Sequence, residues 1–321
     1  MKPIIFFSFL FIVLIIYGCH SKKTETIKVS GAWALYPMMC VWADEYQKDH
    51  WVKIEVSGGG AGKGISDVLN GQVDIAMVSR LIKKEELEQG AFYLSVTKDA
   101  VIATINGKNP VLAEIQEQGV SREDLESIFL KKITRWGELV GKELEHDEIV
   151  VYGRADASGA AQVWAAFLGD HTQAELQEKA DANFSGDQAL CNGVKSVRNA
   201  IGFNNLNYAY DIEKGGFAEN IRPVPIDLNA NGRLDSMENF YNLRQDLVAK
   251  VSEGVYPSPP ARLEFLVSKG PFNKKSKAFV SWIMHEGQKF ITENGYVQLP
   301  VTDIQRETQY LISGHRDPYE K

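Results

Sequence analysis

Hydrophobic and polar positions alternate along the chain with two periods, one typical of strands and one typical of helices. The first part of the chain predicts strands at 27–30, 52–56, 73–78 and 93–106, and helices at 37–49 and 65–69. Short strands that alternate with helices favour a mainly parallel sheet, because each helix returns the chain to the same edge of the sheet. The predicted strand at 93–106 is much longer than the other three.

The alternation of strands and helices begins again after this stretch. Ser121 precedes a helix with an acidic first turn, and a strand at 149–152 is followed by a helix that opens at Ser158. Further along, the pattern predicts a helix at 240–251, a strand at 262–267 and an amphipathic helix at 275–292 that ends by Gly295. We therefore expect an α/β protein of two lobes, each a mixed, mainly parallel sheet flanked by helices, with a ligand-binding cleft between them.

The first 18 residues are typical of an export signal. Their apolar run is shorter than the roughly 20 residues that cross a bilayer. The run ends at Cys19 in a pattern that resembles the lipobox of bacterial lipoproteins, in which the cysteine carries the lipid. We expect residues 1–18 to be removed and 19–26 to form a tether. Lipid on Cys19 would then anchor the protein to the bacterial cell membrane, facing the periplasm or the cell exterior.

The composition narrows the possible functions. The chain has 321 residues, and its 35 Lys and Arg against 42 Asp and Glu give a formal charge of −7. Nucleic-acid surfaces are usually strongly basic, so we expect no nucleic-acid partner. A small anion is not excluded, because a few N–H groups and one Arg can hold it whatever the net charge. Pairing of Cys40 with Cys191 stays open, although their apolar neighbours favour buried thiols.

A glycine-rich turn at 57–64 lies between a predicted strand and a predicted helix. Glycine lets the backbone approach a ligand closely, and the free N–H groups of a helix N-terminus attract an anion. The turn is not a nucleotide-binding loop, because Lys63 is followed by Gly64 where that loop needs Ser or Thr. The alternative is a tight turn that only packs the helix on the strand.

A second turn, at 154–160, has a clearer oxyanion chemistry. Arg154 can donate two charged hydrogen bonds to one anion, and Ser158 can add its hydroxyl. The N–H groups of Gly159 and Ala160 lie at a helix N-terminus, and Asp156 is placed to hold the guanidinium. The alternative is a capping serine beside a surface pair of Arg and Asp.

Six short motifs follow one another in an order that resembles a known family. They are Ser30-Gly31-Ala32 with Tyr36-Pro37, the glycine-rich turn, Val73-Asp74-Ile75 with Ser79-Arg80, the turn at 154–159, Ala200-Ile201-Gly202-Phe203, and Gly287-Gln288-Lys289-Phe290 with Gly295-Tyr296-Val297. Together they resemble the substrate-binding protein of the phosphate-specific ABC transporter over nearly the whole mature chain. The resemblance implies a type II-like periplasmic-binding-protein fold that closes on phosphate, serves an ABC permease and performs no catalysis. With it we place lobe 1 at 27–104 and 263–321, and lobe 2 at 105–262.

The resemblance also implies a set of ligand-binding residues. They are Ser30, Tyr36, Ala61, Gly62, Ser79, Arg80, Arg154, Ser158, Gly159 and Ala160, with Asp156 orienting Arg154. Three hydroxyl donors of the family are missing, because Leu35, Ala61 and Ala160 stand where it has Thr, Ser and Thr. Ser79 stands where some members have an Asp that accepts a proton from phosphate. Either phosphate binds through other donors such as Ser30, Ser79 and Arg80, or the pocket serves another ligand.

Residues 227–238 match a calcium-binding EF-hand loop at every ligand position. The expected ligands are Asp227, Asn229, Asn231, the backbone carbonyl of Arg233, Asp235 and Glu238. A predicted strand precedes the loop where a calcium sensor has a helix, so we expect a structural calcium ion. The alternative is a surface turn that binds nothing.

Catalytic functions find little support in the sequence. The histidines show no zinc spacing, and Ser158 lies in Ala-Ser-Gly with no obvious general base. We expect a lipid-anchored solute-binding protein, not an enzyme, that captures phosphate or a related oxyanion. Two alternatives stay open: the same fold with another ligand or partner in sensing or surface interaction, and a phosphoester hydrolase with the same oxyanion pocket.

Overall fold

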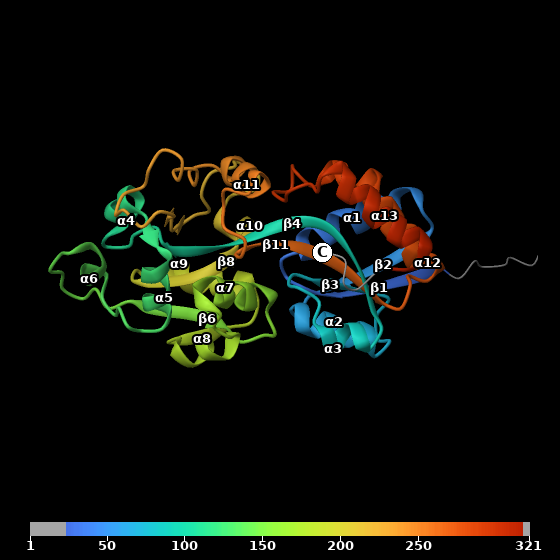
Figure 1. Ribbon diagram of the computed structural model, residues 1–321, viewed down its shortest axis with the longest axis horizontal. Coiled ribbons are helices and arrows are strands. Elements are labelled where there is room, and N and C mark those ends of the chain that lie inside the picture. The colour runs from blue at the N-terminus through green and yellow to red at the C-terminus, as the bar shows by residue number, and fades with distance from the viewer. Residues whose placement is uncertain (1–23, 317–321) are drawn as a thin grey trace, which may run out of the picture.

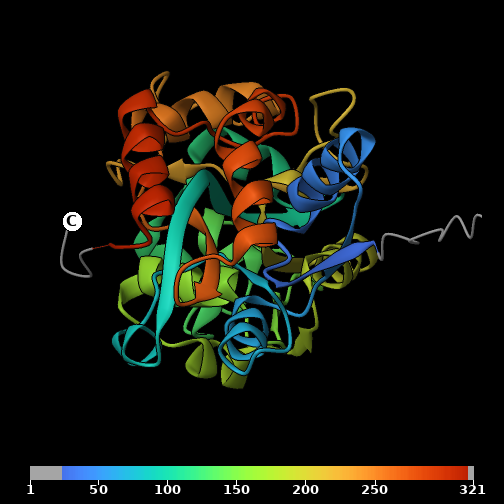
Figure 2. The ribbon, with the colours of Figure 1, turned by 90° about the vertical axis from the view of Figure 1, so that its right-hand side faces the viewer.

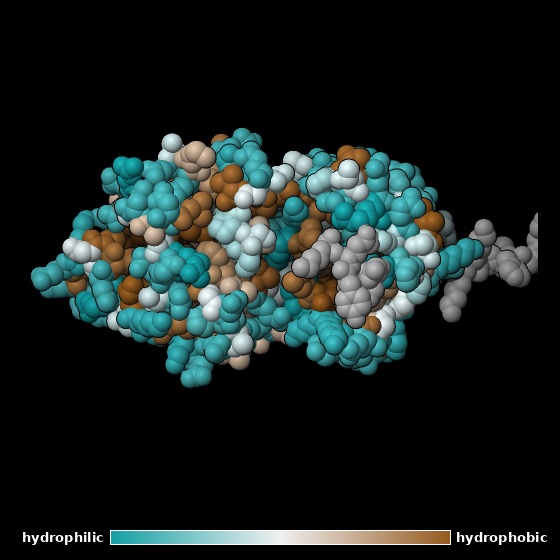
Figure 3. Space-filling model, viewed as in Figure 1, coloured by the Kyte–Doolittle hydropathy of each residue, from teal (hydrophilic) through white to brown (hydrophobic). Residues whose placement is uncertain are grey.

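The computed structural model describes residues 24–316, in which two bodies lie side by side along the long axis of the molecule (Figure 1). The export signal, the lipobox with Cys19 and most of the tether lie outside the described residues. No helix within residues 24–316 is long and apolar enough to span a membrane. Hydrophilic residues cover most of the face shown in Figure 3.

The first body combines N-terminal strands with C-terminal helices. Its elements are β1 (Glu25–Gly31), α1 (Tyr36–Asp49), β2 (Val52–Ser57), α2 (Ala61–Leu69), β3 (Ile75–Val78), α3 (Lys84–Glu88), α12 (Lys274–Met284), a 3-10 helix (Glu286–Phe290) and α13 (Val301–Ser313). Strand β1 pairs in parallel with β2 and β3, as the alternation of strands and helices predicts. Pro37 lies in the first turn of α1, where its missing N–H costs no helical hydrogen bond.

The second body contains the middle of the chain. Its elements are α4 (Leu112–Gln118), β5 (Val120–Ser121), α5 (Arg122–Phe129), α6 (Trp136–Val140), β6 (Val150–Arg154), α7 (Gly159–Gly169), α8 (Gln173–Lys179), β7 (Ala182–Phe184), α9 (Asp187–Ser196), β8 (Ala200–Asn205), α10 (Leu206–Ala209), β9 (Ile221–Pro223), β10 (Ile226–Asp227) and α11 (Arg244–Glu253). Strand β6 pairs in parallel with β7 and β8. Ser121 caps α5, since its hydroxyl oxygen accepts the N–H of Asp124 at 3.1 Å.

Two long antiparallel strands join the bodies, β4 (Ala91–Asn106) and β11 (Ala261–Lys269). The sheet order is β2-β1-β3-β11-β4-β8-β6-β7, with β9 also on β4. Parallel pairs therefore lie toward both ends of the sheet, and antiparallel pairs form where the chain crosses. Figure 2 shows β4 close to the C-terminal helices of the first body.

Each body has its own hydrophobic core. One core takes its residues from 27–96 and 265–311, and the other takes nearly all of them from 100–261. The change from one core to the other falls within β4 and within β11, the two strands that carry the predicted lobe boundaries. The boundaries themselves stay a prediction.

Three helices differ from the sequence-based prediction. The helix expected at 65–69 begins already at Ala61. The helix expected at 275–292 ends at Met284 and continues as a 3-10 turn, because the backbone leaves the helical conformation at His285, whose N–H donates to the Trp282 carbonyl oxygen at 3.1 Å. The helix expected at 240–251 begins only at Arg244. The hydroxyl of Tyr241, which accepts the N–H of Ile226 at 3.1 Å, holds the preceding segment to β10. Cys40 and Cys191 are free thiols.

Candidate functional site

The two turns that the sequence singles out are in direct contact between the two bodies. The N–H of Gly62, in the first turn of α2, donates to the carbonyl oxygen of Ala157 at 3.1 Å. Gly60 has a φ of +91°, and a Cβ there would lie 2.7 Å from the same oxygen. Position 60 of the glycine-rich turn therefore needs glycine, both for its backbone conformation and for the close approach of the Ala157 carbonyl. At this point the bodies are closed on each other.

A small pocket lies beside this contact and is lined by both bodies. The first body contributes Ala32, Trp33, Ala34, Gly60, Ala61 and Ser79, and the second contributes Arg154, Ser158, Gly159, Ala160, Asp187 and Asn205. All of these residues except Trp33 are buried. The lining thus combines one cation, hydroxyl and amide groups, and the first residues of α2 and α7, a set of groups that suits a small anion.

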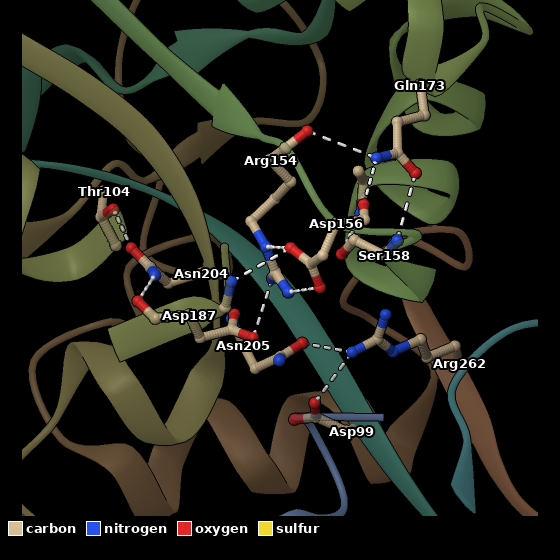
Figure 4. A network of polar contacts seen from close by, with 12 residues as sticks. Asp99, Thr104, Arg154, Asp156, Ser158, Gln173, Asp187, Asn204, Asn205 and Arg262 are labelled. Carbon is tan, nitrogen blue, oxygen red and sulfur yellow. Dashed lines mark hydrogen bonds and ion pairs between the residues drawn. The ribbon is translucent and has the colours of Figure 1, made fainter. Parts of the chain in front are cut away.

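Arg154 supplies the positive charge of the pocket. Its Nε and Nη2 donate to the two carboxylate oxygens of Asp156 at 2.8 Å each, and its Nη1 donates to Asp187 Oδ2 at 2.8 Å (Figure 4). Burial opposes the charge, but the Asp187 and Asp156 carboxylates raise the pKa of Arg154 above its ordinary value. Two carboxylates therefore hold the guanidinium charged and in one orientation. Its remaining N–H groups meet no acceptor within residues 24–316.

Asp187 is itself held by β8. Its Oδ1 accepts the backbone N–H of Asn205 at 3.1 Å, and its carbonyl oxygen accepts the Asn204 side-chain N–H at 3.1 Å. The Thr104 hydroxyl, on β4, donates to Asn204 Oδ1 at 2.8 Å. All four residues, which are labelled in Figure 4, are buried. A buried polar network with its hydrogen bonds made favours a single geometry, so the acid that orients Arg154 is fixed by strands of its own body.

The first turn of α7 adds backbone donors to the pocket. Ser158 is the N-cap, and its hydroxyl oxygen accepts the N–H of Ala161 at 3.2 Å. Its own hydroxyl proton is left for another acceptor. The N–H groups of Gly159 and Ala160 have no partner in the part of the chain that the structure describes, as expected for the first helical residues. A Cβ on Gly159 would lie 2.3 Å from the Ser79 hydroxyl, so glycine brings this helix end up to β3.

Gln173 on α8 fixes the loop that joins Arg154 to Ser158. Its Nε2 donates to the carbonyl oxygen of Asp156 at 2.6 Å, and its Oε1 accepts the N–H of Ser158 at 3.2 Å. The loop is thereby braced from the side opposite the pocket network (Figure 4).

Most of the predicted ligand residues come together in this structure. Ala61, Ser79, Arg154, Ser158, Gly159 and Ala160 line the pocket, and Gly62 and Asp156 lie in direct contact with it through Ala157 and Arg154. Leu35 is buried in the core of the first body. Because Ala61 and Ala160 line the pocket with methyl groups, the side-chain donors that remain are Arg154, Asn205 and the two serines.

Ser30, Tyr36 and Arg80 do not line the pocket. The Ser30 hydroxyl donates to Asp67 at 2.7 Å, and the Arg80 Nη1 and Nη2 donate to Glu86 at 2.8 and 2.6 Å. These groups bond to a carboxylate of their own body, while Arg80 Nε has no hydrogen bond within residues 24–316. Contact of Ser30, Tyr36 and Arg80 with a ligand stays a prediction. Tyr36 starts α1 with its ring 5.5 Å from that of Trp33, outside the pocket lining.

Six lining residues are not among the predicted ligand residues: Ala32, Trp33, Ala34, Gly60, Asp187 and Asn205. Asp187 follows a glycine and opens α9, so the strand, turn and helix pattern that marked Ser158 was also present there. Asn205 ends β8, directly after the motif Ala200-Ile201-Gly202-Phe203. Nothing in the local sequence of Trp33 distinguishes it from a core tryptophan.

A second buried ionic cluster lies on the crossing strands, and we call Asp99, Arg262 and Glu264 the crossing-strand cluster. Arg262 Nη2 donates to Asp99 Oδ2 at 3.3 Å and to the side-chain oxygen of Asn205. Its Nε lies 3.2 Å from Glu264 Oε1, but neither Glu264 oxygen makes a hydrogen bond within the described residues. Burial raises the pKa of Asp99 to about 6 against the effect of Arg262, and burial raises that of Glu264 well above its usual range.

The predicted calcium loop folds as a turn with its oxygens directed at backbone N–H groups. Asp227 accepts the N–H of Gly232 at 2.8 Å, and Glu238 accepts those of Leu228 at 2.9 Å and Asp235 at 3.0 Å. No three Asp, Glu, His or Cys side chains within residues 24–316 are grouped to hold a metal ion. Calcium binding stays a prediction, and a rise of Tm with calcium that Glu238→Gln abolishes would support it.

Comparison with known proteins assigns the family. The model of the PBP superfamily domain matches residues 20–286, so the chain belongs to the PBP superfamily. Protein SphX of Synechococcus elongatus is 28% identical over 310 residues, which cover 91% of this chain and 83% of SphX. The phosphate-binding protein PstS of Bacillus subtilis is 24% identical, covering 89% of this chain and 84% of PstS.

A solved structure confirms the fold. A putative phosphate ABC transporter substrate-binding protein with bound phosphate from Clostridium perfringens superposes with a TM-score of 0.69 at 23% identity. The match covers 86% of this chain and all of that one. The two-lobed α/β fold predicted from the sequence is therefore confirmed, with a mixed sheet flanked by helices in each body.

Proposed function

We propose that the protein captures phosphate, or a related tetrahedral oxyanion, between its two bodies. The observation that carries the proposal is Arg154, a buried guanidinium held by two carboxylates that keeps N–H groups free. An oxyanion that leaves water needs donors for its oxygens. The Ser79 and Ser158 hydroxyls and the N–H groups of Gly159 and Ala160 are the nearest further donors in the lining.

The missing hydroxyl groups weaken such a site but do not remove its main donor. Each hydrogen bond to a charged group contributes roughly 1.5–3 kcal/mol, so three lost hydroxyls correspond to several powers of ten in affinity if nothing replaces them. The backbone N–H groups of Gly159 and Ala160 at the N-terminus of α7 offset part of the loss here. The relatives named as phosphate-binding proteins, aligned over most of their length, support phosphate as the ligand.

The role that follows is transport and not catalysis. The pocket presents no activated nucleophile and no general base beside Ser158, and the PstS relatives are named as phosphate-binding proteins. We propose delivery of the oxyanion to an ABC permease outside the cytoplasm. Lipid on Cys19 would keep the protein at the membrane.

Calorimetry on ligand-free mature protein tests the proposal. The protein is unfolded, stripped of ligand, refolded, and titrated separately with phosphate, sulfate and molybdate. Phosphate binding at micromolar or lower Kd is expected. If folded protein binds none of the three anions, the proposal is overturned. That result would favour the second candidate, a pocket that serves another ligand, and the specific observation for it is the Ala61 and Ala160 methyl groups in the lining.

A further inference from the structure

Trp33 lines the pocket and lies between the two bodies. It belongs to the turn between β1 and α1, and its benzene ring covers Gly58, where a Cβ would lie 2.3 Å from the ring carbons. Its indole nitrogen faces Gly186 of the second body, where a Cβ would lie 3.3 Å away. One large ring is thus packed between a glycine of each body.

Trp33 differs from every other residue of the pocket lining. The other eleven lining residues are buried, and Trp33 is partly exposed. The apolar positions around it are small, since they are Ala32, Ala34, Gly60, Ala61, Gly159 and Ala160. Trp33 is therefore the one lining residue at which the pocket borders solvent.

We propose that Trp33 is a specificity-determining residue that closes the oxyanion pocket and restricts it to free tetrahedral anions, so that phosphate monoesters are rejected. The inference rests on the proposed function and names its ligand class. An ester carries a carbon substituent on one oxygen, and that substituent has to leave the pocket through the position of the indole. The same ring lies against Gly186 of the second body, so its contact with that body would also favour closure on a ligand that fits.

The test compares inorganic phosphate with methyl phosphate, the smallest monoester, by calorimetry on three proteins. Wild type is expected to bind phosphate and not methyl phosphate. Trp33→Ala is expected to bind phosphate about tenfold or more weakly and to gain methyl phosphate binding, which lowers the ratio of the two affinities by at least about tenfold. Trp51→Ala is the matched control, because Trp51 is 81% exposed and outside the pocket, and it should behave as wild type.

Gly58→Ala provides a second variant that keeps the indole but displaces it. Its backbone is not in the left-handed region, so the added methyl group acts through the ring it meets. The same gain of methyl phosphate binding is expected, and it serves as the readout if Trp33→Ala fails to fold.

The outcomes separate this inference from the function on which it rests. Phosphate binding in wild type, with methyl phosphate still rejected by Trp33→Ala and Gly58→Ala, overturns the inference alone. Wild-type protein that is folded and binds no phosphate overturns the proposed function and the inference with it.

Discussion

Arg154 and Arg262 are both buried between carboxylates, yet their hydrogen bonding is very different. Each of the three guanidinium nitrogens of Arg154 donates to Asp156 or Asp187 at 2.8 Å. In Arg262 only Nη2 donates, while Nε and Nη1 have no hydrogen bond within residues 24–316. Asn205 links the two clusters, since its N–H donates to Asp187 and its side-chain oxygen accepts from Arg262.

The difference corresponds to what each region has to do. A binding group works best when its orientation is fixed before the ligand arrives, because little freedom is then lost on binding. Arg154 meets this condition. The crossing-strand cluster lies on β4 and β11, the two strands that any movement between the bodies must bend. Unpaired buried groups cost about 1–3 kcal/mol each, so this region is held less firmly than the pocket.

The largest effect is expected from Arg154→Ala. The loss of two charged hydrogen bonds to the anion should weaken phosphate binding by roughly 100-fold to 10,000-fold. The uncompensated carboxylates of Asp156 and Asp187 should also lower the free energy of unfolding by about 3–5 kcal/mol. Calorimetry and urea unfolding measure the two effects. Arg154→Lys is the control that keeps the charge but cannot contact both acids, and an affinity of Arg154→Ala within tenfold of wild type would refute the site.

The second largest effect is expected on the pH dependence of stability, through Asp99 of the crossing-strand cluster. Because the pKa of Asp99 is raised from 3.8 to about 6, the folded state binds its proton more tightly than the unfolded state. The contribution is present below pH 4 and is lost as the pH rises toward 6, by up to about 3 kcal/mol. Asp99→Asn removes this slope. In urea unfolding between pH 4 and 7, the free energy of unfolding of the variant should rise relative to that of wild type as the pH increases. The same pH dependence in both proteins would contradict the assignment.

A smaller loss is expected from Asp187→Asn. The amide oxygen still accepts the Asn205 N–H, but the side chain no longer carries the charge that orients Arg154. Phosphate affinity should fall by about tenfold, in line with the loss of one charge-assisted hydrogen bond. Glu178→Gln on α8 is the control, because that side chain is 77% exposed. Equal affinity in Asp187→Asn and wild type would show that Asp156 alone positions the arginine.

Glu264→Gln should have the smallest effect. Burial raises the pKa of Glu264 well above its usual range and so favours its neutral form, and its oxygens make no hydrogen bond in the described part of the chain. The amide of Gln then replaces a group of similar shape. The free energy of unfolding at pH 7 should change by less than about 1 kcal/mol. A decrease of several kcal/mol in the free energy of unfolding would mean that Glu264 is ionised and paired with Arg262. The arginines of both clusters would then be held by ionised carboxylates.

Much of the site could be predicted from the sequence because several of its residues are close neighbours along the chain. Asp156 lies two residues after Arg154, and Ser158 caps the helix that begins at the next residue, so short-range geometry fixes both. The strand, turn and helix pattern placed them at the edge of the sheet. The glycine-rich turn was predicted for the same reason, since positive φ and close backbone contact are properties of the residue itself.

The remaining features depend on which distant residues the fold brings together. Ser30 and Arg80 carry suitable donors, but the structure pairs their side chains with Asp67 and Glu86 and leaves both residues outside the pocket lining. Asp187 reaches Arg154 across 33 positions, and Arg262 reaches Asp99 across 163. A sequence determines which groups are available and how nearby residues turn. Only the packing of the two bodies decided which donors stayed free for a ligand, because buried hydrogen bonds form with whatever partner the tertiary structure places within reach.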